Sequence, residues 1–282
     1  MSLFLDSFWR AVAYCLHPRV IGLSILPLLL MVMAAAGLGY FFWESAVNGV
    51  FLWLESTAWL ESFTQWLADM GMSGLKNALA PLIVIFAVTP VLVVVVLFFV
   101  ALLMMPALVN LVARRRFPTL QRRHGASFTR SAFWSLGSML LALFALAISV
   151  PLWLIPPLVL VLPPFIWGWL TYRVMTFDAL ADHASGDERR RVFKYHRGWL
   201  LLMGVATGYL GAAPSIVWAS GWFFAAAFPI LIPVAIWIYT LVFAFSGLWF
   251  AHYCLAALDQ LREADSEATT MMPPPDSVQL LP

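Results

Sequence analysis

The sequence predicts an all-α, polytopic integral membrane protein, and three observations support this fold class. Of the 282 residues, 63% are hydrophobic and only 11% are charged, whereas a soluble domain carries about 25% charged residues. Four long stretches contain no Asp, Glu, Lys or Arg, as helices in a membrane or a protein interior require. Prolines gather in the middle of two of these stretches, which predicts helices that turn back on themselves.

The charged residues indicate which segments lie on which side of the membrane. The uncharged stretches are residues 20–43, 77–113, 131–172 and 198–258. Basic residues close to a membrane edge favour the cytoplasmic side. Residues 114–130 hold six basic residues and no acid, and residues 173–197 hold six basic and four acidic residues, so both segments are predicted to be cytoplasmic. Residues 44–76, with a single Lys, are predicted to lie outside.

The first two uncharged stretches must then each cross the membrane once, as long transmembrane helices. The other two begin and end on the cytoplasmic side, so each is predicted to form a proline-broken helical hairpin. In the third stretch the arms are predicted near residues 131–149 and 165–175, and the second arm is too short for a regular crossing. Partial penetration is therefore expected. The prolines predicted to break helices are Pro18, Pro27, Pro106, Pro151, Pro156 and Pro214.

These elements predict one membrane domain over residues 1–262, followed by a disordered tail over 263–282. The predicted segments are an amphipathic N-terminal helix (1–18) with Phe4, Phe8 and Val12 on one side, a transmembrane helix (20–43), an external amphipathic segment (44–76), a second transmembrane helix (77–113), a basic cytoplasmic loop (114–130), a hairpin (131–175), a cytoplasmic amphipathic helix (176–197) and a second hairpin (198–258). Both termini are then cytoplasmic.

Residues 17–29, HPRVIGLSILPLL, resemble the start of the first transmembrane helix of bacterial CysZ sulfate permeases, members of the etoposide-induced-protein domain superfamily. Pro106 with Asn110 is similar to the polar end of that family's second long helix. Residues 172–182, which contain Phe177 and Asp178, are similar to the short acidic stretch after its first hairpin. The resemblance implies two long transmembrane helices and two hairpins that enter the membrane only partly.

The resemblance also identifies a difference in the part of the family that is associated with sulfate binding. Two adjacent arginines follow the proline that corresponds to Pro18 in CysZ proteins. In this chain those positions are Ile21 and Gly22. Two guanidinium groups can neutralise a dianion and can each donate a pair of parallel hydrogen bonds to it. Arg19 alone provides one such group. The residues predicted to lie along a solute path are Arg19, Asn110, Arg173 and Asp178.

The segment that begins at Ser185 contains the pattern of a capped, basic helix. Ser185 and Glu188 have the spacing of a capping box. The basic residues that follow are Arg189, Arg190, Arg191, Lys194 and Arg197. This basic face could rest on anionic lipid headgroups, or it could form a vestibule that concentrates anions before they enter a path.

Gly204, Gly208 and Gly211, followed by Ala212 and Ala213, form a stripe of small residues. Such a stripe lets helix backbones approach closely, either within one protomer or across a dimer. A homo-oligomer is expected, with the lipid bilayer as the other partner and no role for nucleic acid.

No catalytic motif, cofactor motif or metal-binding spacing was recognised, so an enzyme is not expected. The leading hypothesis is a permease-like protein, with several membrane passes in the bacterial inner membrane, that passes a small anionic solute. The family resemblance favours sulfate as the solute, but the absence of the arginine pair argues against it. The alternative is a membrane scaffold or envelope-homeostasis protein that transports nothing.

Overall fold

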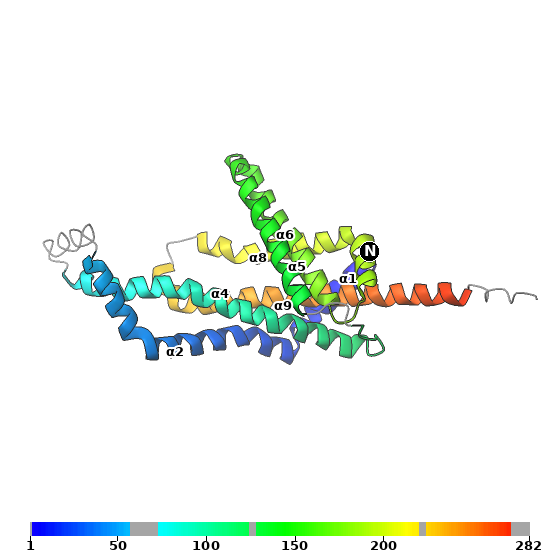
Figure 1. Cartoon of the computed structure of the whole chain (residues 1–282), viewed down its shortest axis with the longest axis horizontal. Coiled ribbons are helices and arrows are strands. Elements are labelled where there is room, and N and C mark those ends of the chain that lie inside the picture. Colours follow the sequence, from blue (N-terminus) through cyan, green and yellow to red (C-terminus); the bar gives the residue numbers. More distant parts are fainter. Residues whose placement is uncertain (1, 57–72, 124–127, 220–223, 272–282) are drawn as a thin grey trace, which may run out of the picture. The chain divides into compact units, whose positions relative to one another are not determined.

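The computed structural model of this chain describes residues 2–56, 73–123, 128–219 and 224–271 (Figure 1). Within these ranges every regular element is a helix. The elements are α1 (Ser2–Cys15), α2 (Pro18–Ser56), α4 (Ser73–Arg116), α5 (Phe128–Ser149), η1 (Val150–Leu154), α6 (Pro156–Leu180), α7 (Gly186–Tyr195), α8 (Arg197–Ala219) and α9 (Phe224–Met271).

Four of these helices contain a stretch that is long and apolar enough to cross a membrane, which confirms the predicted all-α, polytopic fold class. The stretches are Pro18–Leu54, Phe133–Leu154, Pro157–Leu180 and Ile236–Ala268. Only 17% of the apolar window is buried in each of the first three, against 78% in the last. The last stretch is therefore packed inside its own compact unit, whereas the other three expose apolar side chains that suit lipid.

The chain forms two compact units. One consists of residues 25–102, that is, most of α2 and the N-terminal part of α4. The other consists of residues 1–24 and 103–282, as far as they are described. It holds α1, α5 to α9 and the candidate site.

The hairpin of the third uncharged stretch is formed by α5, η1 and α6. Pro151 lies in η1, Ile155 is extended (φ −99°, ψ 105°), and Pro156 is the first residue of α6. The expectation of an arm near 165–175 was too short, because α6 continues through Pro163 and Pro164.

A long-range hydrogen bond compensates for one of these prolines. Because Pro164 has no N–H, the carbonyl of Leu160 loses its donor within the helix. The hydroxyl of Tyr209, on α8, donates to that carbonyl at 3.0 Å.

The six prolines predicted to break helices divide into two groups. Pro18, Pro151 and Pro156 lie at helix boundaries or in η1. Pro27, Pro106 and Pro214 lie inside α2, α4 and α8, and these helices continue past them. Residues 220–223, within the predicted second hairpin, lie outside the described residues, as do Trp59 and Trp66 of the predicted external segment.

The centre of the larger unit is α9, in which every residue from 248 to 258 is buried. The N-terminal helix α1 packs on it: the ring centroid of Phe8 lies 5.0 Å from Trp249, and that of Phe4 lies 5.2 Å from Trp249. Val12, predicted on the same face, is exposed. Helix α9 continues to Met271, so the first part of the predicted disordered tail is helical, and residues 272–282 lie outside the described residues.

Helices α6 and α8 are in close backbone contact, and glycines make this contact possible. A Cβ atom on Gly204 would overlap the carbonyl oxygen of Gly168, and one on Gly168 would lie 2.5 Å from the Cα of Val205. A Cβ on Gly208 would lie 3.2 Å from the carbonyl oxygen of Pro164. Two glycines of the predicted stripe therefore pack within the protomer, whereas Gly211 has open space around its Cα.

Candidate functional site

Helix α7 begins with the predicted capping box. The hydroxyl of Ser185 accepts a hydrogen bond from the backbone N–H of Glu188 at 3.2 Å, and the carboxylate of Glu188 accepts one from the backbone N–H of Ser185 at 2.7 Å. Both interactions satisfy amides that have no partner within the helix. The cap fixes where α7 begins and therefore which of its residues share a face.

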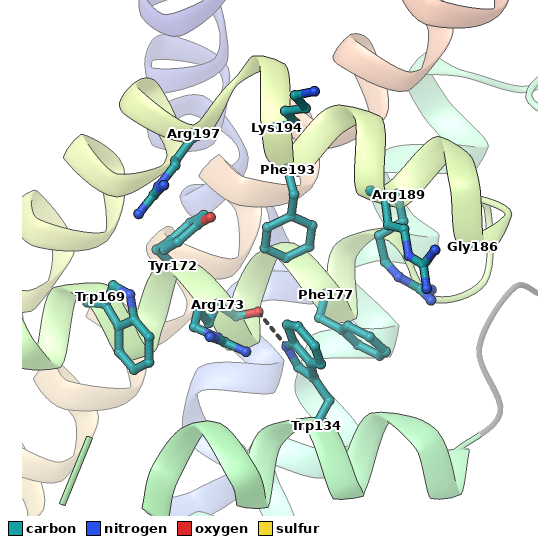
Figure 2. Close-up of a pocket in the computed structure, with 11 residues that line it drawn as sticks. Trp134, Trp169, Tyr172, Arg173, Phe177, Gly186, Arg189, Phe193, Lys194 and Arg197 are labelled. Carbon is teal, nitrogen blue, oxygen red and sulfur yellow. Dashed lines mark hydrogen bonds between the residues drawn. The ribbon is translucent and has the colours of Figure 1, made fainter. Parts of the chain in front are cut away.

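One face of α7 and the following turn line a cavity of about 430 Å³ (Figure 2). The spacing of these residues, three or four apart, is that of one helical face. From α7 and α8 they are Gly186, Arg189, Arg190, Phe193, Lys194 and Arg197. The hairpin supplies the rest: Trp134 from α5, and Trp169, Tyr172, Arg173 and Phe177 from α6. Among the residues that the structure describes, the lining thus contains five cationic and five aromatic side chains and no carboxylate.

Arg173 lies between two indole rings. Its guanidinium carbon is 4.4 Å from the ring centroid of Trp134 and 4.9 Å from that of Trp169. The indole N–H of Trp134 donates to the carbonyl oxygen of Arg173 at 3.3 Å, as Figure 2 shows. The Nε atom of Arg173 is buried and has no hydrogen-bond partner among the described residues. The rings therefore hold this cation in place and leave its Nε hydrogen-bonding capacity unused.

Arg189 is a second cation of the site that packs on a ring, and it is only 5% exposed. Its guanidinium carbon lies 4.3 Å from the ring centroid of Phe177. The Phe177 ring in turn stacks on Trp134, with centroids 5.3 Å apart and planes 20° from parallel. Arg190, Lys194 and Arg197 are exposed. The cavity thus has two cations packed on aromatic rings and three at the surface.

Two carboxylates on or beside α7, those of Glu188 and Asp265, bind cations outside the cavity lining. The Glu188 carboxylate accepts hydrogen bonds from Arg123 at 2.8 Å and from Arg262 at 2.9 Å. Arg191 forms a bidentate pair with Asp265, at 3.0 and 2.9 Å. Burial raises the pKa of Glu188, but the hydrogen bonds from Arg262 and from the Ser185 N–H, with the charges of Arg262 and Arg123, lower it to about 2.

The structure brings one of the four predicted path residues into the cavity, namely Arg173. Arg19 is exposed in the first turn of α2, where its backbone N–H donates to His17 Nδ1 at 3.1 Å. The side-chain oxygen of Asn110 accepts a hydrogen bond from Arg122 at 2.5 Å. Asp178 is half-buried on α6 and does not line the cavity. The solute path through these residues remains a prediction.

The aromatic residues of the cavity were missed at the sequence level. The basic residues of α7 were recognised as one possible anion vestibule, but the rings that complete it come from α5 and α6. Trp169, Tyr172 and Arg173 share a helical face by their spacing, which was a signal for part of the set. The approach of Trp134 is a long-range contact that periodicity does not encode.

The arrangement favours binding over catalysis. Clustered cations in a partly enclosed site raise the local positive potential and attract anions. Guanidinium groups packed on rings present their N–H edges to a ligand. Within the described ranges no three His, Cys, Asp or Glu side chains gather where they could hold a metal ion.

Comparisons with known proteins give a family match. Residues 7–220 match the model of the family described as "Sulfate transporter CysZ/Etoposide-induced protein 2.4". No curated protein and no solved structure matches the chain.

Proposed function

Because the chain belongs to the sulfate transporter CysZ/etoposide-induced protein 2.4 family, we propose that it is a permease-like protein that passes a small anion across the bacterial inner membrane. The observation that carries the proposal is the cavity between α5, α6, α7 and α8, whose described lining holds five cations and no carboxylate. The protein acts as a transporter and not as an enzyme.

The position of the cavity on the hairpin supports its role at a membrane surface. Trp134 lies near the start of α5, and Trp169 and Arg173 lie in the second half of α6, so the site is at the end of the hairpin opposite η1. Trp residues favour the membrane–water interface, and basic residues favour its cytoplasmic side. We place the cavity at the cytoplasmic surface, with both termini on that side.

The identity of the anion depends on which cations bind it. The positions of the arginine pair associated with sulfate in CysZ proteins are Ile21 and Gly22 in this chain. The binding groups proposed here are instead Arg173 and Arg189, which the rings of Trp134 and Phe177 support. The solute is therefore an anion, and sulfate is one candidate among several.

A flux assay tests the proposal. The full chain is reconstituted in liposomes, and uptake of sulfate, sulfite, phosphate and small organic anions is measured. We expect flux of at least one of these anions, reduced about tenfold or more by the double substitution Arg173→Gln and Arg189→Gln, since a hydrogen bond to a charged group contributes about 1.5–3 kcal/mol.

Arg191→Gln is the matched control, because Arg191 lies on the same helix but pairs with Asp265 outside the cavity lining. It should leave flux close to that of the unmodified chain. Absence of flux for every anion would overturn the proposal.

Stable co-purifying partners, found in the absence of flux, would favour the scaffold alternative. The packing of Gly204 and Gly208 on α6 means that these two residues are already used within the protomer and lend that alternative little support.

A further inference from the structure

The cavity is large for an inorganic oxyanion. Pockets of about 300–1,000 Å³ hold drug-sized ligands, and a volume of about 430 Å³ falls within that range. A water molecule occupies ~30 Å³ in the liquid, so an anion with four oxygens would leave most of the space to water. Five of the eleven described lining residues are aromatic, and such rings add little to the binding of a bare, strongly hydrated ion.

We propose that the cavity binds an organic anion in which one anionic group is joined to a flat, apolar body. This inference rests on the proposed function, since it names the class of solute or ligand that the same site takes. The anionic group accepts hydrogen bonds from Arg173 and Arg189, and the flat body packs against the exposed parts of the aromatic lining.

The anionic end of the ligand is recognised by guanidinium groups that are already held in position. The guanidinium carbon of Arg173 lies 4.4 and 4.9 Å from the centroids of two indole rings, which hold the group in position. Its Nε is buried and has no hydrogen-bond partner among the described residues. The side chain as a whole is half-buried, so we infer that a ligand oxygen accepts from its terminal N–H groups and not from the buried Nε. Arg197 is exposed and lies close to Tyr172 in Figure 2, where it adds a further positive charge.

The flat part of the ligand has rings to pack against. Trp134, Trp169 and Phe193 are not fully buried, so each has ring surface that a ligand can cover. The ring of Phe193 lies 5.6 Å from that of Tyr172 and 6.2 Å from that of Trp134, both edge to face. A planar ligand in the cavity would extend this cluster with further offset or edge contacts, which contribute more than the burial of area alone.

A matched series of sulfonates tests the inference. The probes are inorganic sulfate, methanesulfonate, benzenesulfonate and 2-naphthalenesulfonate, with neutral 2-naphthalenesulfonamide as the uncharged control. Binding to the full chain is measured by calorimetry in nanodiscs of zwitterionic lipid, with empty discs subtracted. We expect affinity to rise along the series, at least about tenfold from methanesulfonate to 2-naphthalenesulfonate, and to fall by a similar factor for the sulfonamide.

Three variants separate the two ends of the ligand. Arg173→Gln should weaken binding of every sulfonate. Trp169→Leu should weaken the aromatic members more than methanesulfonate, and Trp169→Phe should restore most of that loss. Arg191→Gln should change none of them. Equal affinity along the series, or binding that none of the pocket variants affects, would overturn the inference.

Two further measurements test whether a lipid occupies the cavity and whether binding and transport are separate. Native mass spectrometry of the purified protein reports on lipid: an anionic phospholipid that the Arg173→Gln variant loses, with no sulfonate bound, would overturn the inference in favour of a headgroup. Flux of the same anions in liposomes separates this inference from the proposed function. Binding without any flux would overturn only the transport proposal, and flux of sulfate with no preference for aromatic anions would overturn only the ligand class.

Discussion

At the scale of single residues, Glu188 connects four parts of the larger unit through one buried carboxylate. It accepts hydrogen bonds from Arg123 after α4, from Arg262 on α9 and from the backbone of Ser185 before α7. Arg262 also donates to the carbonyls of Gln121 and His183. The sequence predicted the capping half of this arrangement, and the structure confirms it. The arginine contacts join residues 65 and 74 positions apart, which local spacing does not encode.

We expect Glu188→Gln to destabilise the protein by about 1–3 kcal/mol, because it leaves the mostly buried Arg262 without its carboxylate. The amide retains an acceptor for the Ser185 N–H, so the cap itself should survive. Thermal unfolding in detergent, followed by tryptophan fluorescence, measures the change. Asp187→Asn is the control, since Asp187 is exposed in the same helical turn; an equal loss for both variants would contradict the assigned role of Glu188.

The same carboxylate predicts a pH dependence of stability. Its pKa is about 2 in the folded protein against an ordinary value of 4.5. A carboxyl group whose pKa is lower in the folded state stabilises the fold above its unfolded pKa, and this contribution is lost as the pH falls toward the folded value. The difference in unfolding temperature between the unmodified chain and Glu188→Gln should therefore be constant above about pH 5 and shrink from about pH 4.5 downward. A difference that stays constant to pH 3 would contradict this.

At the scale of elements, the hairpin shows where sequence rules succeed and where they fail. The turn between α5 and α6 was predicted from proline density, and η1 lies there. The length of the second arm was underestimated, because Pro163 and Pro164 were assumed to stop a helix. Helix α6 passes through them, and a donor on another helix, the Tyr209 hydroxyl, bonds the carbonyl that Pro164 leaves free. A prediction made from the residues of α6 alone cannot include a hydrogen-bond donor that lies on α8.

The contact between α6 and α8 predicts that the glycines of the stripe are not equivalent. Gly204→Val should be strongly destabilising, by about 1–3 kcal/mol or more, because its Cβ would overlap the backbone of Gly168 and the helices would have to separate. Gly211→Ala should be tolerated, since no atom lies within 4 Å of the added Cβ. Detergent-solubilised yield and unfolding temperature measure both. If Gly211→Ala proved as damaging as Gly204→Val, the close contact would not be the cause.

At the scale of the whole molecule, the sorting of charges along the chain predicted more than composition did. It located the uncharged stretches from which the membrane fold follows, and it identified the basic segment that became one wall of the cavity. The charge pattern did not predict the aromatic wall of the cavity. Trp134 and Trp169 are typical of a membrane interface, and nothing in their own segments indicates that they lie opposite α7. The family resemblance agrees with the family match and the helical fold. Arg19, Asn110 and Asp178 do not line the cavity, and their place on a solute path stays a prediction.

The orientation of the protein remains a prediction that the same charges make. If α7 is cytoplasmic and the end of α2 is external, then Asp187→Cys and Ser56→Cys, both at exposed positions, lie on opposite sides of the membrane. In a background that carries Cys15→Ser and Cys254→Ala, a membrane-impermeant maleimide should label Ser56→Cys in intact spheroplasts and should label Asp187→Cys only after permeabilisation. The reverse pattern would contradict the predicted orientation and would place the cavity, with its five cations, on the outer side of the membrane.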